Sequence, residues 1–259
     1  MPDSRFIIAY MHLYKCGGTT FNWILQKCFP GRVLYCENSK RNNTPILKGQ
    51  LNSYLEMGAR DACALSSHLI NFDALCCAHL VVTTIREPSS RIRSAYNFDI
   101  LSGNFAGSFD EYIEVYRNFM VEKLGVPFLA SLNTDRVFTC ILEQYDLSLV
   151  CLEHHVIEKG LGPIDFAYRA RLNVAPVLVP GSMSQVGKPT DRQLLRIQQI
   201  NDIDHQFYEH QSQQLINYAK RIPDIDERLL DFRNRCKHLS SSENLLSSYG
   251  QGPDDFTYI

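Results

Sequence analysis

Residues 5–29 have the sequence RFIIAYMHLYKCGGTTFNWILQKCF, and this stretch decides the fold. Its first part, 5–12, is short and mostly apolar, with β-branched and aromatic side chains, which is typical of a buried strand. A turn that contains two glycines follows. From 19 to 29 apolar side chains then recur at helical spacing, until a Pro-Gly pair ends the helix. The stretch therefore predicts a strand, a glycine turn and a helix.

The same alternation of strand and helix continues along the chain. Further strands are predicted over residues 32–37, 61–67, 79–86 and 147–152, and helices over 45–57, 89–100, 110–124 and 190–207. The last helix starts with a capping box of Thr190 and Gln193. Alternating strands and helices predict an α/β fold with a mainly parallel central sheet flanked by helices. We expect one domain over residues 1–239 and a poorly ordered tail, rich in Ser, Gly and Asp, over 240–259.

Composition and charge argue against several classes of protein. The chain of 259 residues has 26 Lys and Arg and 28 Asp and Glu, and its net charge of −2 gives no general attraction for nucleic acid or an anionic membrane. No apolar run is long enough to predict a transmembrane helix, and the N-terminus lacks the pattern of a signal peptide. Nine cysteines without a CxxC pair are typical of reduced thiols. We therefore expect a cytoplasmic protein with no nucleic-acid or membrane partner.

The glycine turn after the first strand is a candidate anion site. Gly17 and Gly18 allow a tight turn and a close approach of the backbone to a ligand. Thr19 and Thr20 begin a helix whose N–H groups and dipole favour a phosphate. Lys15 adds a positive charge, but because it precedes the glycines the loop is not a Walker A motif. The alternative is a plain glycine turn beside a solvated lysine.

A second candidate lies in VVTTIREPSSRIRSAYNF, residues 81–98. Arg86 follows a predicted strand, at the carboxyl end where open α/β sheets bind ligands. Ser94 comes eight residues later, and Arg91 shares its helical face. A guanidinium fork with a hydroxyl suits a dianionic phosphate. For Arg91 and Arg93 the simpler expectation is a surface salt bridge.

Together, the two segments resemble the nucleotide-binding signatures of the sulfotransferases that use 3′-phosphoadenosine 5′-phosphosulfate (PAPS). KCGGTTF (15–21) resembles the loop that holds the 5′-phosphosulfate, and Arg86 with Ser94 resembles the pair that holds the 3′-phosphate. SSHLINFDAL (66–75) and VGKPTDRQLLRIQQINDIDHQFYEH (186–210) are similar to segments of the uronyl and heparan sulfate 2-O-sulfotransferases. The resemblance implies a three-layer, P-loop-like α/β fold.

This resemblance also implies the chemistry. Lys15 would neutralise charge that develops on the bridging oxygen of the donor, and residues 17–20 would hold the 5′-phosphate. Arg86 and Ser94 would hold the 3′-phosphate. His68, whose type of side chain titrates near neutral pH, would act as general base for an acceptor hydroxyl. PAPS is then the co-substrate, no metal is expected, and the acceptor is a small molecule or a glycan.

Other positions are matched less sharply. Ser184 and Lys188 resemble the strap that closes over the adenosine in this family. Phe21 either stacks on the adenine or belongs to the apolar face of its helix. Tyr14 and Cys16 stand where these enzymes often carry Pro and Thr or Ser, and neither change removes a charge.

Two other functions stay open. One is a nucleotide-dependent phosphoryl transferase (a kinase) on the same fold, and the other is a non-catalytic nucleotide-binding protein. A fold alone does not choose between them. The remaining histidines that we weighed, His12, His79, His154 and His155, are expected to be structural or solvated, with the last two on a strand.

Overall fold

The computed structural model describes residues 6–36, 46–57, 61–132, 134–169 and 187–241. Its centre is a parallel sheet of five strands, β1 (Phe6–Met11), β2 (Val33–Tyr35), β3 (Ala64–Ser67), β4 (Ala78–Ile85) and β5 (Val137–Ile141). The strand order is β2-β3-β1-β4-β5. Tyr10 of β1 pairs with Ser66 of β3 on one side and with Val82 of β4 on the other. The predicted α/β fold with a mainly parallel sheet is confirmed.

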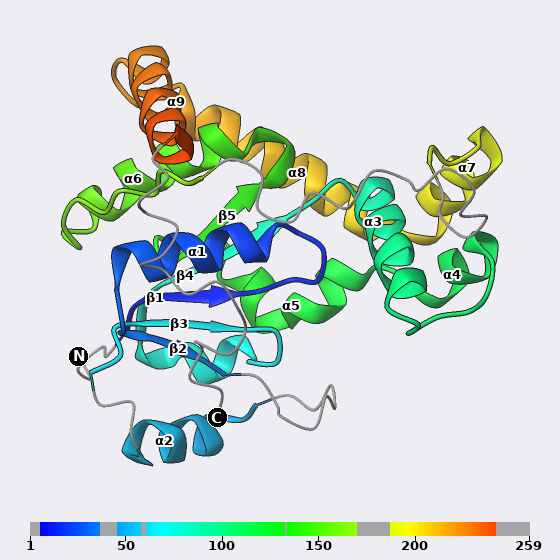
Figure 1. Ribbon diagram of the computed structural model, residues 1–259, viewed down its shortest axis with the longest axis horizontal. Helices are drawn as coiled ribbons and strands as arrows, with labels where there is room; N and C mark the ends of the chain where they lie inside the picture. Colours follow the sequence, from blue (N-terminus) through cyan, green and yellow to red (C-terminus); the bar gives the residue numbers. More distant parts are fainter. Residues whose placement is uncertain (1–5, 37–45, 58–60, 133, 170–186, 242–259) are drawn as a thin grey trace.

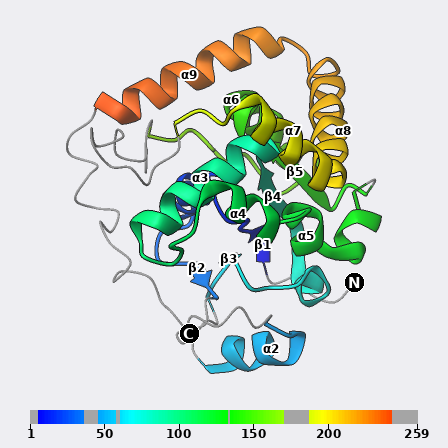
Figure 2. The ribbon, with the colours of Figure 1, turned by 90° about the vertical axis from the view of Figure 1, so that its right-hand side faces the viewer.

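Helices cover both faces of this sheet. They are α1 (Gly18–Cys28), α2 (Lys48–Met57), η1 (Phe72–Cys77), α3 (Pro88–Leu101), α4 (Phe109–Val115), α5 (Phe119–Ala130), η2 (Leu142–Gln144), α6 (Tyr145–Glu158), α7 (Asp191–Ile200), α8 (Asp202–Ala219) and α9 (Ile225–Ser241). Helix α1, blue and partly hidden behind α3 in Figure 2, lies over one face, while α5 lies over the other. The short helix η1 contacts both β1 and α5. Helices α3, α4 and α7 lie beyond the carboxyl ends of the strands, where the arrows of β1 and β3 point (Figure 1).

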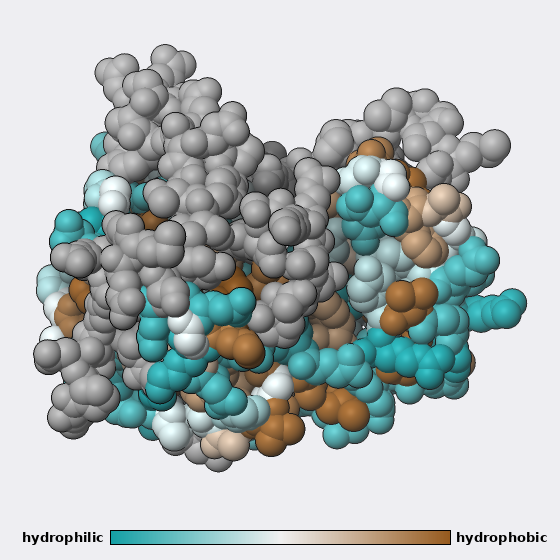
Figure 3. All heavy atoms as spheres, turned by 90° about the horizontal axis from the view of Figure 1, so that it is seen from below, coloured by the Kyte–Doolittle hydropathy of each residue, from teal (hydrophilic) through white to brown (hydrophobic). Residues whose placement is uncertain are grey.

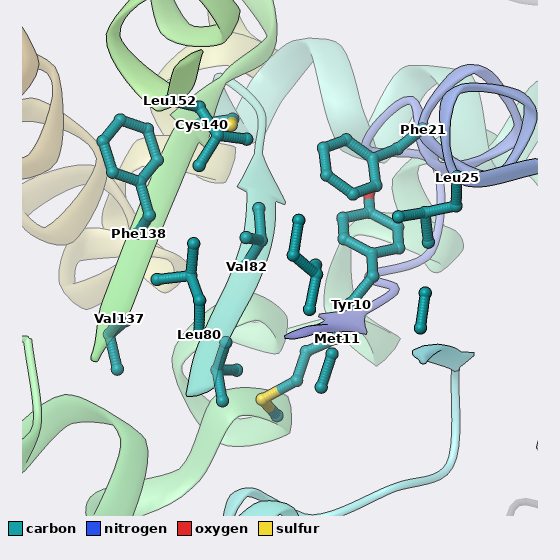
Figure 4. Close-up of a cluster of buried hydrophobic side chains, with 14 of the residues drawn as sticks. Tyr10, Met11, Phe21, Leu25, Leu80, Val82, Val137, Phe138, Cys140 and Leu152 are labelled. Carbon is teal, nitrogen blue, oxygen red and sulfur yellow. The ribbon is translucent and has the colours of Figure 1, made fainter. Parts of the chain in front are cut away.

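The core forms where α1 packs on the sheet. Tyr10 of β1 stacks on Phe21 of α1 with ring centroids 4.2 Å apart, and both are fully buried. Figure 4 shows these rings next to each other, with Leu80 and Val82 on the neighbouring strand β4 and Phe138 beyond them on β5. Burial of large apolar side chains is the main favourable term in folding. This packing fixes α1 over the carboxyl end of β1, and thereby fixes the glycine loop between them.

The strand predicted over 147–152 is wrong. These residues lie in α6, and the fifth strand is the earlier segment 137–141, which sequence analysis missed. A short continuous apolar run does not distinguish a buried strand from a buried helix. In this protein Leu149, Cys151 and Leu152 are all buried within α6. His154 and His155 therefore lie on a helix as well.

Two predicted helices are interrupted, and one set of hydrogen bonds explains both breaks. Residues 110–124 divide into α4 and α5, and 190–207 divide into α7 and α8. Asn118, at a φ of 43°, accepts hydrogen bonds from the N–H groups of Ile203 and Asp204 at the start of α8. Asp204 in return accepts from the N–H groups of Met120 and Val121 at the start of α5. Each helix thus caps the other across more than 80 residues of chain, which local periodicity does not reveal.

Helix α9 was not predicted, and it continues through Ser241. The expected boundary at 239/240 therefore falls inside the last turns of a helix, and the rest of the predicted tail lies outside the described residues. None of the described helices is both long and apolar enough to cross a membrane. On the face seen in Figure 3, the hydrophobic residues that are not grey form small groups among hydrophilic ones, which is ordinary for a protein surface.

Candidate functional site

Four strands of the sheet deliver polar residues to the same edge. Because the strands are parallel, His12 after β1, His68 after β3, Arg86 after β4 and Glu143 shortly after β5 all follow carboxyl ends. Strand β1 lies between β3 and β4, so the chain crosses from one side of β1 to the other between these two strands. Such a reversal of strand order opens a crevice at the carboxyl ends, which is where α/β sheets bind ligands.

The glycine loop begins α1 in the geometry of an anion site. Gly17 is the N-cap at φ 84° and ψ 15°, a left-handed conformation that favours glycine. As a glycine, this N-cap residue offers no side chain to the free N–H groups of the helix, and the N–H of Thr20 bonds the carbonyl of Gly17 at 3.1 Å. Thr19 is exposed beside the first turn. Backbone N–H groups and the positive end of the helix dipole together favour a phosphate or sulfate at this position.

Lys15 lies in the same loop, at a φ of 63°. Its ammonium is 4.1 Å from the ring centroid of Phe98 and 5.9 Å from that of Tyr14. Among the described residues it makes no ion pair. Partial burial lowers the pKa of Lys15 below its ordinary value, and the neighbouring charge of Arg86 lowers it further, while the charge of Asp99 offsets part of this. A cation held in this way gains from the arrival of an anion.

Arg86 is joined to this loop directly. Its Nη1 donates to the carbonyl oxygen of Lys15 at 3.2 Å. Its buried Nε has no hydrogen-bond partner among the described residues and lies 3.9 Å from Oε1 of Glu143. Glu143 is occupied elsewhere: it accepts a hydrogen bond from the N–H of Glu87 and another from the hydroxyl of Tyr208 at 3.1 Å. The guanidinium of Arg86 therefore keeps hydrogen-bonding capacity for a ligand.

Helix α3 continues from Arg86, and its start is well defined. Glu87 caps it by accepting from the N–H groups of Ser89 and Ser90, with Pro88 at the first helical position, where its fixed φ suits a helix. Ser94 lies on this helix and is half-buried. Sequence analysis did not identify Glu87 as a cap or Glu143 as a neighbour of Arg86. Both are charged residues that follow the end of a strand, and this was the feature of the sequence that could have identified them.

Arg91 and Arg93 are not in the surface salt bridges that we expected. Arg91 is 0% exposed, and none of its three guanidinium nitrogens has a hydrogen-bond partner among the described residues. The guanidinium lies 4.6 Å from the ring centroid of Phe119, and burial lowers the pKa of Arg91 while Asp204 counteracts part of this. Arg93 donates to the carbonyl of Gly187 at 2.7 Å. One arginine thus belongs to the interior, and the other ties α3 to the segment before α7.

His68 follows β3 through a short hydrogen-bonded turn. The hydroxyl of Ser67 accepts from the N–H groups of Leu69 and Ile70 and donates to the carbonyl of Cys36. The ring of His68 stacks on that of His12, with centroids 3.6 Å apart and an interplanar angle of 33°. We expected His12 to be structural or solvated. Its position directly after a strand end, as for Arg86, was the signal that it belongs beside the candidate site.

A carboxylate network holds the other side of the loop. The hydroxyl of Tyr14 donates to Asp99 of α3 at 2.6 Å, and the hydroxyl of Tyr112 in α4 donates to the other oxygen of the same carboxylate. Asp99 is buried. The residue that departs from the family pattern, Tyr14, therefore anchors the Lys15 loop to two helices. Nothing in the local sequence connects positions 14, 99 and 112.

Two of the predicted ligand contacts do not fit, or are not described. Phe21 is fully buried between Tyr10 and Phe166, with ring centroids at 4.2 and 6.2 Å. It belongs to the core and offers no ring face to an adenine, so the apolar-face alternative is the correct one. Ser184 lies outside the described residues, and Lys188 is exposed in the segment before α7.

Comparisons with known proteins give few matches. No protein-family model matches the chain, and neither does any curated protein. Among solved structures, a sulfotransferase from Alicyclobacillus acidocaldarius is 15% identical with a TM-score of 0.41, over 66% of this chain and 87% of that one. The mouse sulfotransferase SULT7A1 complexed with PAP (adenosine 3′,5′-bisphosphate) is 12% identical with a TM-score of 0.42, over 89% of each chain. At these identities and TM-scores the likeness says nothing about activity.

Proposed function

We propose that this protein is a sulfotransferase that moves the sulfuryl group of PAPS to an acceptor hydroxyl. One observation carries the proposal. Lys15 and Arg86, two cations that repel each other, are held together at the start of α1 by the hydrogen bond from Arg86 to the Lys15 carbonyl. Holding like charges together in a partly buried site costs free energy unless an anion neutralises them. A nucleotide with phosphate groups at both its 5′ and 3′ positions supplies anions for both.

Each residue then has a role in the transfer. The N–H groups of residues 17–20 hold the 5′-phosphate, and Arg86 with Ser94 holds the 3′-phosphate. The acceptor oxygen attacks sulfur as His68 takes its proton, and a new S–O bond forms. The bond from sulfur to the bridging oxygen breaks, and the electron pair leaves on the nucleotide, where Lys15 stabilises the charge. As in phosphoryl transfer, positioning and charge stabilisation do most of the catalytic work.

The acceptor and the location follow from the sequence. The resemblance of 66–75 and 186–210 to the 2-O-sulfotransferases supports a carbohydrate or glycoconjugate acceptor. It also supports a strap over the adenosine that includes Ser184 and Lys188, to which the bond from Arg93 to Gly187 gives an anchor. Six of the described cysteines are free thiols, namely Cys16, Cys28, Cys63, Cys140, Cys151 and Cys236, which is in keeping with a cytoplasmic protein.

The deciding experiment is calorimetric titration with adenosine 3′,5′-bisphosphate (PAP), ATP and ADP. We expect micromolar or tighter binding of PAP alone, and a loss of at least about tenfold, or 1.4 kcal/mol, in Arg86→Ala. Arg228→Ala is the matched control, because Arg228 is exposed on α9 and the one hydrogen bond of its side chain to a described residue goes to the carbonyl of Pro223. No preference for the 3′-phosphate would exclude the proposal. Activity that requires ATP and Mg²⁺ would favour the kinase alternative, and tight PAP binding without turnover on any acceptor the non-catalytic one.

A further inference from the structure

We propose that His12 is a positioning residue that lies between the ring of His68 and the phosphate-binding loop and sets the distance between them. This inference rests on the proposed function, because it assigns a partner to the proposed general base. The ring of His12 contacts both parts of the site. Its face stacks on His68 with centroids 3.6 Å apart, and its Nε2 edge lies against the backbone of Gly18 at the start of α1.

The contact with Gly18 leaves no spare room. A Cβ added at Gly18 would lie 1.6 Å from Nε2 of His12 and 1.9 Å from Cδ2. Gly18 is in ordinary helical conformation, so the absence of a side chain here serves the approach of the imidazole and not an unusual φ. The first turn of α1, which would hold the 5′-phosphate, is thereby set at a fixed distance from the His68 ring. A base and a phosphate site kept at a fixed distance meet the geometric demand of an in-line transfer.

The chemical state of His12 suits this task. Burial lowers its pKa well below the ordinary value, and the charges of His68 and Lys15 act in the same direction. The ring is therefore neutral, and it separates two groups of the site without adding a positive charge. The ring of Tyr10, near the end of β1, lies 5.5 Å from that of His12 and is neutral as well, because burial raises the pKa of its hydroxyl.

A plain core role explains His12 poorly. Its Nδ1 is buried and has no hydrogen-bond partner among the described residues. An unsatisfied buried nitrogen costs stability, a cost that an apolar side chain does not have. An imidazole at position 12 is in keeping with a hydrogen bond that Nδ1 makes when nucleotide and acceptor are bound.

The test is a double-mutant cycle between His12→Ala and His68→Gln, with single-turnover transfer from radiolabelled PAPS to desulfated glycosaminoglycan oligosaccharides as the readout. If His12 acts through His68, His12→Ala lowers the rate at least about tenfold in the wild type but less than about twofold in His68→Gln. PAP affinity changes less than about twofold in both. Equal losses in the two backgrounds would overturn the proposal. His79→Ala, on an exposed histidine of β4, is the matched control.

A second measurement separates this inference from the proposed function. The ring protons of His68, assigned by their loss in His68→Gln, should be shifted upfield in the NMR spectrum by the stacked imidazole. His12→Ala removes that shift. His12→Phe keeps an aromatic ring at this position and serves as a second variant in case His12→Ala does not fold. It should retain the shift and lose less activity than His12→Ala. An unchanged His68 signal in a folded His12→Ala overturns the inference even where PAP binds. Loss of the shift in a protein that does not bind PAP confirms the stack while the proposed function fails.

Discussion

Two arginines in different regions of the molecule differ in how completely their guanidinium groups are paired with carboxylates. On α9, Arg235 pairs with Glu153, Asp165 and Asp231, and these bonds tie α9 to α6 and to the segment that follows it. At the carboxyl edge of the sheet, Arg86 has a buried Nε without a hydrogen bond and a carboxylate no nearer than 3.9 Å. Most buried polar groups find hydrogen-bond partners within the protein, although those of Arg91 do not among the described residues. We expect Arg86, which keeps hydrogen-bonding capacity at the edge of the sheet, to serve a ligand and Arg235 to serve the fold, and this contrast leads to four predictions.

The largest effect is expected for Lys15→Met, which removes the charge at the edge but keeps an apolar side chain beside Phe98. We expect kcat to fall by about 100-fold or more, because removing one group that stabilises transition-state charge has an effect of this size. The measurement is PAP release from PAPS. Lys159→Met is the matched control, since Lys159 pairs with Asp135 at 2.9 Å, far from the loop in sequence and at the end of α6. A similar loss of kcat in both variants would contradict a special role for the lysine at the edge of the sheet.

Arg235→Ala should have the converse effect. Loss of its carboxylate partners lowers the free energy of unfolding by about 1–2 kcal/mol, because the pairs are partly buried and charge-assisted, and leaves PAP affinity unchanged. Arg86→Ala should lower PAP affinity with little loss of stability. Chemical denaturation and calorimetry on the two variants measure both quantities. If Arg86→Ala destabilised the fold as much as Arg235→Ala does, the edge arginine would be structural.

The fold could be predicted from sequence wherever local pattern decides the structure. The strand, glycine turn and helix of residues 6–28 were predicted correctly, as were the strands before His68 and Arg86. The fifth strand could not be placed, because the apolar run of 147–152 competes with it and only tertiary packing shows that this run is helical. The break at Asn118 depends on contacts with α8, more than 80 residues away in sequence.

The candidate site divides in the same way. Lys15 and Arg86 are found from sequence because each adjoins a predicted strand or glycine turn. His12 and Glu143 also follow strand ends, but their proximity to this pair depends on the strand order β3-β1-β4-β5. The proximity of Asp99 depends on the packing of α3 and α4. The burial of Arg91 is a further example. Helical spacing placed it beside Ser94, but its side chain lies over Phe119 in the interior.

The pH dependence of nucleotide binding sharpens the comparison further. Burial and Arg86 lower the pKa of Lys15, so the free protein loses this charge at a pH below that of an ordinary lysine. A bound anion favours the charged form. PAP affinity should therefore be constant below that lowered pKa and fall as pH rises through it, by about tenfold per pH unit at most for one proton. Calorimetry from pH 7.5 upward measures this, and Lys15→Arg should delay the fall to higher pH. A flat profile in the wild type would show that Lys15 does not contact the nucleotide.

The smallest effect is expected for Glu143→Gln. Glu143 is the one described carboxylate within ion-pair distance of Arg86, and its charge opposes any anion that Arg86 binds. The amide keeps an oxygen that can accept from the N–H of Glu87 and the hydroxyl of Tyr208. At the effective dielectric of a protein surface, removing this repulsion strengthens PAP binding by about two- to fivefold. The gain should shrink as salt screens the charges. Weaker binding in Glu143→Gln would instead mean that the carboxylate orients Arg86. Arg86 would then be held by a carboxylate, as Arg235 is, although its Nε makes no hydrogen bond to a described residue.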